Sequence, residues 1–314
     1  MENSAEKMVI LADINCDLSP ELRAYFGIEE YIQGHVHFSD GREIMSKLDW
    51  SNIDRESFYK DLSGTKVKIS TSPLSPDEYY VIFEKHIKEG RKVLSMSVSS
   101  KVSSTFNSAH TACERIKKDY PDSEIYAFDS YRTSGGFGML VCQAAEMRKN
   151  GKSFKEIIDW LEANKNTVHQ MGPIDDLMFV ARRGRISTGK AIMGSFAGVK
   201  PMGDCNSNGY VTVLTKAKGI KKALDITVKY IKETAKDIEN SYIIVTHSGR
   251  EMYAQTLGQM IEEQLKPKKV FVGDVFCGSG TNIGPGMVCA YYLGDEISED
   301  LVAEKEVMNK IVGK

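Results

Sequence analysis

The sequence predicts an α/β fold in which mostly parallel sheets are covered by helices. Compact apolar runs of strand length alternate along the chain with longer amphipathic segments of helix length. This alternation is typical of strand–helix–strand units, which place helices over a parallel sheet. The length of 314 residues corresponds to about two domains of roughly 100–200 residues each. The hydrophobic fraction of 41% and the charged fraction of 27% are those of a globular protein.

The predicted strands are short runs dominated by apolar residues, the pattern of buried strands. They comprise residues 8–12, 93–98, 125–128, 242–246 and 270–276. A polar, glycine-containing loop at 203–209 separates two further segments, which favours a β-hairpin formed by residues 200–202 and 210–214.

The predicted helices carry apolar residues at spacings of three and four, which places them on one face. In residues 76–89, for example, this face contains Tyr79, Phe83 and Ile87. The same pattern predicts helices over residues 105–116, 136–147, 154–163, 219–234, 251–265 and 298–312.

A polar stretch at residues 164–173 ends in Gly172-Pro173 and interrupts this alternation. We therefore expect a domain boundary there, with an N-terminal α/β domain at 1–168 and a C-terminal α/β domain at 169–314. The C-terminal domain would end in the extra helix at 298–312.

The composition argues against binding to nucleic acid or to an anionic membrane, and against insertion into a membrane or secretion. The net charge of −2 creates no overall field that would attract nucleic acid or an anionic membrane. No apolar run approaches the ~20 residues of a membrane span, and the polar residues 1–7 do not resemble a signal peptide. The six cysteines are far apart and form no CxxC pair, so we expect buried free thiols. These features predict a cytoplasmic protein.

Four small polar segments are the most informative feature of the chain, and we expect them to form turns. Two of them follow predicted buried strands, so they should gather at the carboxyl edge of a sheet, where ligands bind. Hydroxyls, amides and Arg185, without an obvious acid or base, indicate a site that holds an anion. Each hydroxyl could instead cap a helix, and Ser72 and Ser103 occupy positions suited to an N-cap. The segments are residues 70–73, 99–105, 182–187 and 280–286.

Two nucleotide-binding motifs are matched only in part, and a common catalytic motif does not occur. Residues 184–191 nearly form a P-loop, but Ala191 stands where a hydroxyl should bind Mg²⁺. Residues 278–284 have one residue too many for a dinucleotide fingerprint, so a tight turn is the better interpretation. No GxSxG nucleophile elbow occurs. We therefore expect no cofactor.

The titratable candidates also have simple structural interpretations. His247 follows a predicted strand without a partner acid or serine, which favours a structural or pocket-rim role. His35 and His37 are two apart, but a zinc site would need further ligands, so a solvent-facing strand edge is expected. Asp13 and Asp129 end strands beside turns, where carboxylates commonly cap backbone amides, and a metal site is the less favoured alternative.

Taken in order, the polar segments resemble those of the DegV family, which includes the fatty-acid-binding subunits of bacterial fatty acid kinase. The resemblance extends from Asp13 to about Gly294. It rests on a Thr-Ser-x-Pro turn, a Ser-Ser…Ser-Gly-Thr segment, an Asp-Ser…Ser-x-Gly element, a Gly-Gly-Arg-Ile turn and a terminal Gly-Pro-Gly. Their counterparts here are residues 70–73, 99–105, 129–135, 183–187 and 284–286.

The resemblance implies a long-chain fatty acid in a buried tunnel, mainly within the larger, N-terminal lipid-binding domain, with its carboxylate in a cleft at the domain interface. It also implies a binding protein without catalysis that presents the acid to a separate kinase subunit. Three alternatives remain open. One is an enzyme acting on a small anion, with His247 or Asp129 as acid or base, and another is a binder of a different lipid or amphiphile. The third is a structural interaction protein, which would not need the polar segments to converge. The implied ligand-binding residues are Thr71, Ser103, Ser104, Arg185, Asn282 and Gly284.

This chain departs from the family pattern at several of these positions. Asn282 stands where the family has a histidine, so the site keeps a hydrogen-bond donor and loses a group that can become positively charged. Ser104 and Arg183 each replace a glycine, and Ile14 replaces the serine after the first-strand aspartate.

Overall fold

The computed structural model describes residues 7–64, 66–186 and 198–313, and it confirms the α/β class. Sheet A is parallel, and its neighbouring strands are linked through helices in the manner expected of strand–helix–strand units. In spatial order it contains β2 (Tyr31–Ile32), β1 (Met8–Asp13), β6 (Lys92–Ser97) and β7 (Ile125–Asp129).

Sheet C lies in the second half of the chain and is mixed. Its first two strands are parallel, and the other two pairings are antiparallel. In spatial order it contains β12 (Lys269–Asp274), β11 (Tyr242–His247), β13 (Val288–Leu293) and β8 (Val168–Met171).

Two small antiparallel sheets complete the described strands. Both contain hairpins whose strands are joined by short loops, and such strands pair antiparallel. Among the strands that the structure describes, parallel pairing occurs in sheet A and in the β11–β12 pair, and the other strand pairings are antiparallel. Sheet B contains β4 (Glu43–Met45), β3 (His35–Phe38) and β5 (Ile69–Ser72), and sheet D contains β10 (Val211–Lys218) and β9 (Val199–Cys205).

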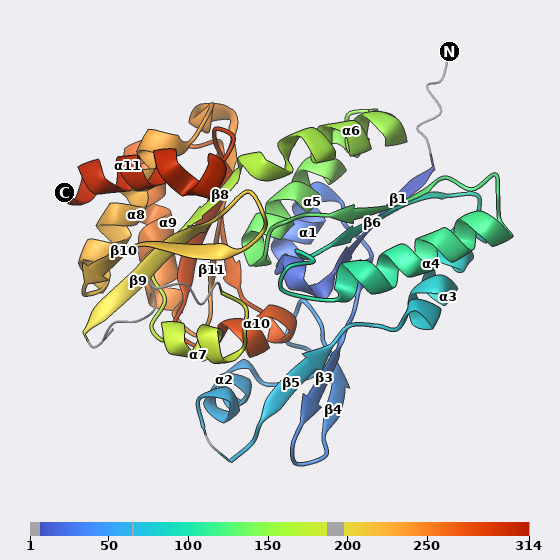
Figure 1. Cartoon of the computed structure of the whole chain (residues 1–314), viewed down its shortest axis with the longest axis horizontal. Helices are drawn as coiled ribbons and strands as arrows, with labels where there is room; N and C mark the ends of the chain where they lie inside the picture. Colours follow the sequence, from blue (N-terminus) through green and yellow to red (C-terminus); the bar gives the residue numbers. More distant parts are fainter. Residues whose placement is uncertain (1–6, 65, 187–197, 314) are drawn as a thin grey trace.

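The helices and the two large sheets form alternating layers (Figure 1). α3 (Pro76–Lys88) and α4 (Thr105–Asp119) cover one face of sheet A. α8 (Ile220–Thr234) and α9 (Glu251–Leu265) cover the outer face of sheet C, and α11 (Val302–Val312) packs on α8 and β10.

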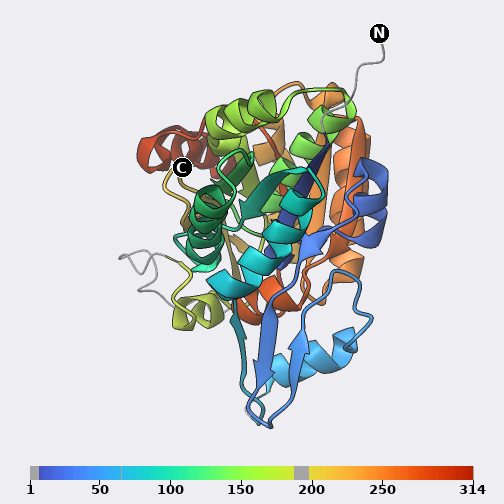
Figure 2. The ribbon, with the colours of Figure 1, turned by 90° about the vertical axis from the view of Figure 1, so that its right-hand side faces the viewer.

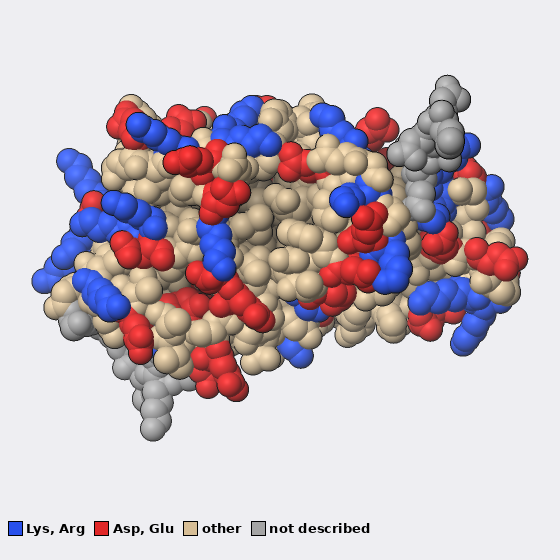
Figure 3. All heavy atoms as spheres, turned by 90° about the horizontal axis from the view of Figure 1, so that it is seen from above, with Lys and Arg blue, Asp and Glu red and all other residues tan. Residues whose placement is uncertain are grey.

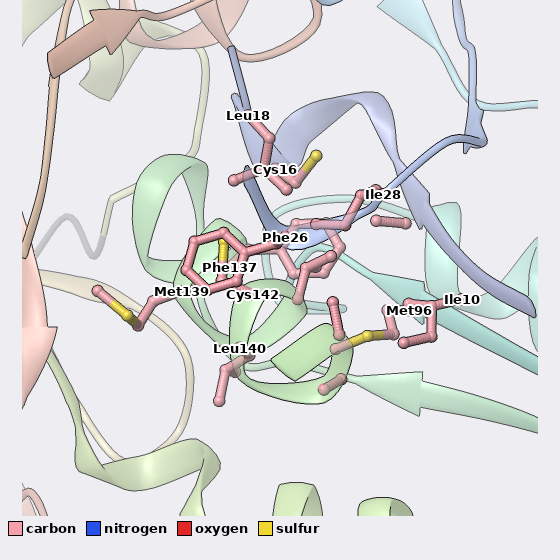
Figure 4. Packing of buried hydrophobic residues seen from close by; sticks show 14 of the residues in the cluster. Ile10, Cys16, Leu18, Phe26, Ile28, Met96, Phe137, Met139, Leu140 and Cys142 are labelled. Atoms are coloured by element: carbon pink, nitrogen blue, oxygen red, sulfur yellow. The ribbon is translucent and has the colours of Figure 1, made fainter. Parts of the chain in front are cut away.

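α5 (Ser134–Lys149) occupies the layer between sheets A and C. It is apolar over most of its surface and almost entirely buried, as expected for a helix enclosed on several sides. Phe137, Met139 and Leu140 of α5 share a core with Ile10 and Met96 of sheet A (Figure 4). The same core reaches sheet C, and its neighbours include α1 (Pro20–Phe26) and α6 (Phe154–Asn164).

Sheet B and α2 (Arg55–Ser63) project from one end of this layered body (Figures 1 and 2). Near the base of the projection lie two short helices, α7 (Leu177–Arg182) and α10 (Cys277–Ile283). Lys, Arg, Asp and Glu side chains are interspersed on the face opposite the projection, with neither sign dominating it (Figure 3). None of the helices in the described part of the chain has the length and apolar content needed to cross a lipid bilayer.

The division into domains 1–168 and 169–314 stays a prediction. Sheet C begins at Val168, and the core around α5 continues from one half of the chain into the other.

Candidate functional site

A cavity of about 180 Å³ lies where sheets A and B meet the starts of α4 and α5 and the side of α10. We call it the polar cavity because hydroxyl, amide and carboxyl groups line much of its wall. It brings together five of the six residues that the resemblance implies, from positions far apart in the sequence. These are Thr71, Ser103, Ser104, Arg185 and Asn282.

Thr71 and Asn282 meet directly in this wall. Asn282 Nδ2 donates a hydrogen bond to Thr71 Oγ1 at 3.3 Å, and both side chains are half-buried. The expected turn at residues 70–73 is wrong for most of its length, because β5 pairs with β3 there. The expected turn at 280–286 is also wrong in its first part, because α10 continues to Ile283.

Ser103 and Ser104 lie at the start of α4. Ser103 Oγ shares a hydrogen bond of 2.7 Å with Thr105 Oγ1 and accepts another from Thr105 N at 3.2 Å. The N-cap is Ser104 instead of Ser103, and its side chain makes no capping hydrogen bond. Ser72 is not an N-cap either, since Ser75 caps α3. The exposed Ser104 hydroxyl and the half-buried Ser103 hydroxyl can therefore face a ligand in the cavity.

Arg185 supplies positive charge at the exposed side of the polar cavity. Its Nη1 donates to the Arg183 carbonyl oxygen. Burial lowers the pKa of Arg183, and the nearby charges of Arg185 and Arg182 lower it further. An anion placed beside this cluster would relieve the repulsion. Ser187 and most of the near-P-loop segment 184–191 lie outside the described residues.

Gly284, the sixth residue, does not line this cavity. It ends α10 with φ +79°, and its N–H donates to the Gly280 carbonyl at 2.8 Å. A Cβ at this position would lie 2.6 Å from Cδ1 of Phe179 on α7. The structure thus places Gly284 where it allows α10 and α7 to pack closely.

Asp13 belongs to the wall of the polar cavity, a position that was not predicted for it. Its carboxylate caps backbone amides as expected, accepting from Asn15 N at 2.8 Å and Val98 N at 2.7 Å, yet it also lines the polar cavity. Burial raises the pKa of Asp13 to about 6. Asp129 likewise caps Ser100 N and Tyr131 N. In the described ranges, no group of three or more His, Cys, Asp or Glu residues is arranged to hold a metal ion.

The amino-terminal ends of α4 and α5 both reach the polar cavity, through Thr105 and Ser134. Unpaired N–H groups and the helix dipole favour an anion at such ends. Ser134 has the unusual φ of +48°. Its hydroxyl donates to Asp17 Oδ2 at 2.6 Å, and Asp17 Oδ1 accepts from Phe276 N. Burial raises the pKa of Asp17 to about 7, which limits the negative charge behind the helix end at neutral pH.

A second cavity, of about 90 Å³, adjoins the first. We call it the apolar cavity. The two cavities share Thr133, Val180, Val211 and Ile283 in their walls. The resemblance implied a tail mainly in the N-terminal domain; apart from Thr133, however, this wall comes from the second half of the chain. The remaining lining residues are Gln170, Gly172, Ile174, Leu177, Ile186, Pro201, Met202, Gly203, Val213, Met287, Cys289 and Tyr291.

His35, His37 and His247, the histidines considered as candidate site residues, differ in their position relative to the two cavities. His247 lines neither cavity; its Nδ1 accepts from Arg250 N at 3.3 Å, which fits a structural role. His35 and His37 lie on the central strand of sheet B, so the expected strand edge is wrong. His35 lines the polar cavity, with its ring nitrogens 3.0 Å from Glu43 Oε1 and 3.2 Å from Glu78 Oε1.

Comparison with known proteins agrees with this architecture. Residues 7–294 match the family model described as "Uncharacterised protein, DegV family". A DegV domain-containing protein of Clostridium perfringens is 32% identical over 290 residues, which cover 92% of this chain and 98% of that relative.

Two solved structures share the fold. One is described as fatty acid binding of a DegV family protein from Thermus thermophilus, with a TM-score of 0.80, 24% identity and coverage of 92% of this chain and 100% of that chain. The other is the Fatty Acid Kinase (Fak) B3 protein of Streptococcus pneumoniae loaded with linoleic acid, with a TM-score of 0.77, 19% identity and coverage of 92% and 100%. From the match over residues 7–294 and the similarity to its relatives, this chain belongs to the DegV family.

Proposed function

We propose that this protein binds a long-chain fatty acid, with the carboxylate in the polar cavity and the acyl tail in the apolar cavity. The observation that carries the proposal is the shared wall between the two cavities, at Thr133, Val180, Val211 and Ile283. A polar cavity that adjoins an apolar one suits an amphiphile better than a small anion.

The head group would be held by donors from both halves of the chain. Thr71 and Ser103 supply hydroxyls, Asn282 supplies an amide and Arg185 supplies a positive charge. These donors lie in the predicted domains 1–168 and 169–314, so we also propose that the carboxylate lies at the interface between them. Charge-assisted hydrogen bonds of about 1.5–3 kcal/mol each would fix its orientation.

The tail would supply most of the binding free energy. Each methylene group removed from water contributes about 0.8 kcal/mol, so a long chain supplies roughly 10 kcal/mol before ordering costs. Fatty acid binding by the Thermus thermophilus DegV family protein and linoleic acid in the Streptococcus pneumoniae Fak B3 protein support this choice of ligand.

We further propose that the protein itself is not an enzyme and presents its ligand to a kinase subunit in the cytoplasm. The name of the Streptococcus pneumoniae Fak B3 protein supports the kinase as a partner. An enzyme acting on a small anion is less well supported, because neither His247 nor Asp129 lines the two cavities.

Mass spectrometry of lipids extracted from the purified protein tests the proposal. We expect a long-chain fatty acid, and delipidated protein should melt at a higher temperature when the acid is returned. Absence of bound lipid, together with no change in Tm for any chain length, would overturn it.

A further inference from the structure

The apolar cavity contains one buried polar side chain that its protein neighbours satisfy only in part. Gln170 lies on β8, is 9% exposed and lines this cavity. Successive side chains of a strand point to opposite faces. His169 stacks on Tyr292 on the α8 side of sheet C, so Gln170 faces the other side. There it is paired in register with Tyr291, which also lines the cavity.

The hydrogen bonds of Gln170 leave its amide nitrogen available. The side-chain Oε1 accepts from Cys205 Sγ at 3.5 Å, and the backbone N–H donates to Asp204 Oδ1 at 2.9 Å. Burial raises the pKa of Cys205 to about 12, so the thiol keeps its proton and remains a donor. Among the residues that the structure describes, Gln170 Nε2 has no hydrogen-bond partner.

This free donor lies in a wall that is otherwise mostly aliphatic. The wall includes Leu177, Met202 and Met287, whose side chains offer a saturated acyl chain only van der Waals contact. A saturated tail lying against Gln170 would remove water from the Nε2 donor without replacing the lost hydrogen bond. A buried donor left without a partner reduces affinity, whereas a ligand oxygen at that point would restore the bond.

We propose that Gln170 selects fatty acids that carry a hydroxyl or oxo group on the acyl chain, through donation from Nε2 to that oxygen. This inference rests on the fatty-acid function proposed above. Gln170 lines the apolar cavity and not the polar one, so the substituent belongs along the tail and not beside the carboxylate.

The test compares stearic acid with hydroxystearic acids that carry the hydroxyl at different carbons along the tail. Dissociation constants are measured for the delipidated natural protein, for Gln170→Leu and for Met287→Leu. Met287 lines the same cavity and has no side-chain donor, so Met287→Leu is the matched control. Gln170→Met replaces Gln170→Leu if the latter fails to fold, as judged by circular dichroism and Tm.

We expect at least one hydroxystearic acid to bind the natural protein roughly tenfold more tightly than stearic acid. The Gln170 variant should lose this preference, and Met287→Leu should keep it. Equal affinities for all isomers and stearic acid, or a preference that survives in the Gln170 variant, would overturn the inference and leave fatty-acid binding intact. Failure of every acid to bind would overturn both proposals.

Discussion

Asn282 on α10 donates a hydrogen bond of 3.3 Å to Thr71 on β5, across 211 positions of the sequence. This contact joins the two halves of the chain at the polar cavity. It also orients Thr71 Oγ1 as an acceptor from Asn282, so the Thr71 hydroxyl proton remains available for a carboxylate.

The hydroxyls of Thr71 and Ser103 should distinguish an acid from an alcohol. Replacing both by Ala should weaken binding of a fatty acid by roughly 10- to 100-fold, since only the anion makes charge-assisted bonds with them. The matching fatty alcohol should lose much less, and titration calorimetry of both ligands measures the difference. Equal losses for acid and alcohol would mean that the hydroxyls do not hold the carboxylate.

Replacement of Asn282 by His should make binding more sensitive to pH. In Asn282→His, an imidazole with its ordinary pKa of ~6.5 would be protonated on the acidic side, so the acid should bind about fivefold more tightly near pH 6 than near pH 8. Asp13 also lines the cavity and titrates at about pH 6, so the natural protein should itself bind slightly better as the pH falls.

For that reason, the measurement is the ratio of the two affinities, natural protein to variant, across pH 6–8. This ratio removes the pH dependence that Asp13 gives to both proteins and leaves the part introduced by His at position 282, including its effect on the pKa of Asp13. A ratio that does not change with pH would show that residue 282 lies too far from the carboxylate for its charge to matter.

A buried histidine makes stability depend on pH. His169 Nδ1 lies 2.8 Å from Asp204 Oδ2, and its Nε2 lies 2.9 Å from the Asp295 carbonyl. Burial alone would lower the pKa of His169. The charge of Asp204, the hydrogen bonds to Asp204 and to the Asp295 carbonyl, and the charge of Glu304 together outweigh burial and hold that pKa above its ordinary value. The stabilisation is therefore fully present below the unfolded-state pKa of ~6.5, and it is lost as the pH rises through the higher folded-state value.

Urea unfolding between pH 6 and 9 checks this expectation. The free energy of unfolding should fall with rising pH in the natural protein. His169→Gln should be less stable by about 3 kcal/mol at pH 6 and should show a flatter pH dependence. An unchanged slope in the variant would assign the dependence to another group.

Gly284 should be more sensitive to substitution than a glycine with the same backbone conformation in open space. Gly284 has φ +79° and ψ 175°, and Gly219 has φ +79° and ψ 162° with no atom within 4 Å of the point where a Cβ would lie. Alanine carries backbone strain of about 1–3 kcal/mol at either site. Crowding against Phe179 should add about 1–3 kcal/mol at Gly284 only. Similar losses of stability in Gly284→Ala and Gly219→Ala would contradict this assignment.

Five of the eight strands in the two large sheets, and most of the helices that cover them, were predictable because their signals are local and strong, whereas β2, β8 and β13 were not predicted. β6 and β11 are buried apolar runs, and α3 carries a regular apolar stripe. Sheet B was missed because its strands are short and partly polar. The Ser and Thr residues of β5 resemble a turn, and only pairing with β3 makes them a strand.

The candidate site was predictable to the extent that its residues belong to a recognisable family pattern. The glycines of α10 suggested a turn, but Gly278 and Gly280 allow close packing on Ile14 and Tyr59, and this packing supports a helix. The position of Gln170 in the apolar cavity could not be predicted, because a single glutamine in a short strand has no sequence pattern that indicates a neighbouring cavity.

The burial of α5 between two sheets has a consequence for unfolding. Neither sheet can lose its core without exposing this helix, so the two halves of the chain should unfold in one cooperative transition. A ligand bound at the amino-terminal end of α5 would then stabilise both halves equally. Occupancy of the site would therefore raise the stability of the whole chain and not only of the residues that line the cavity.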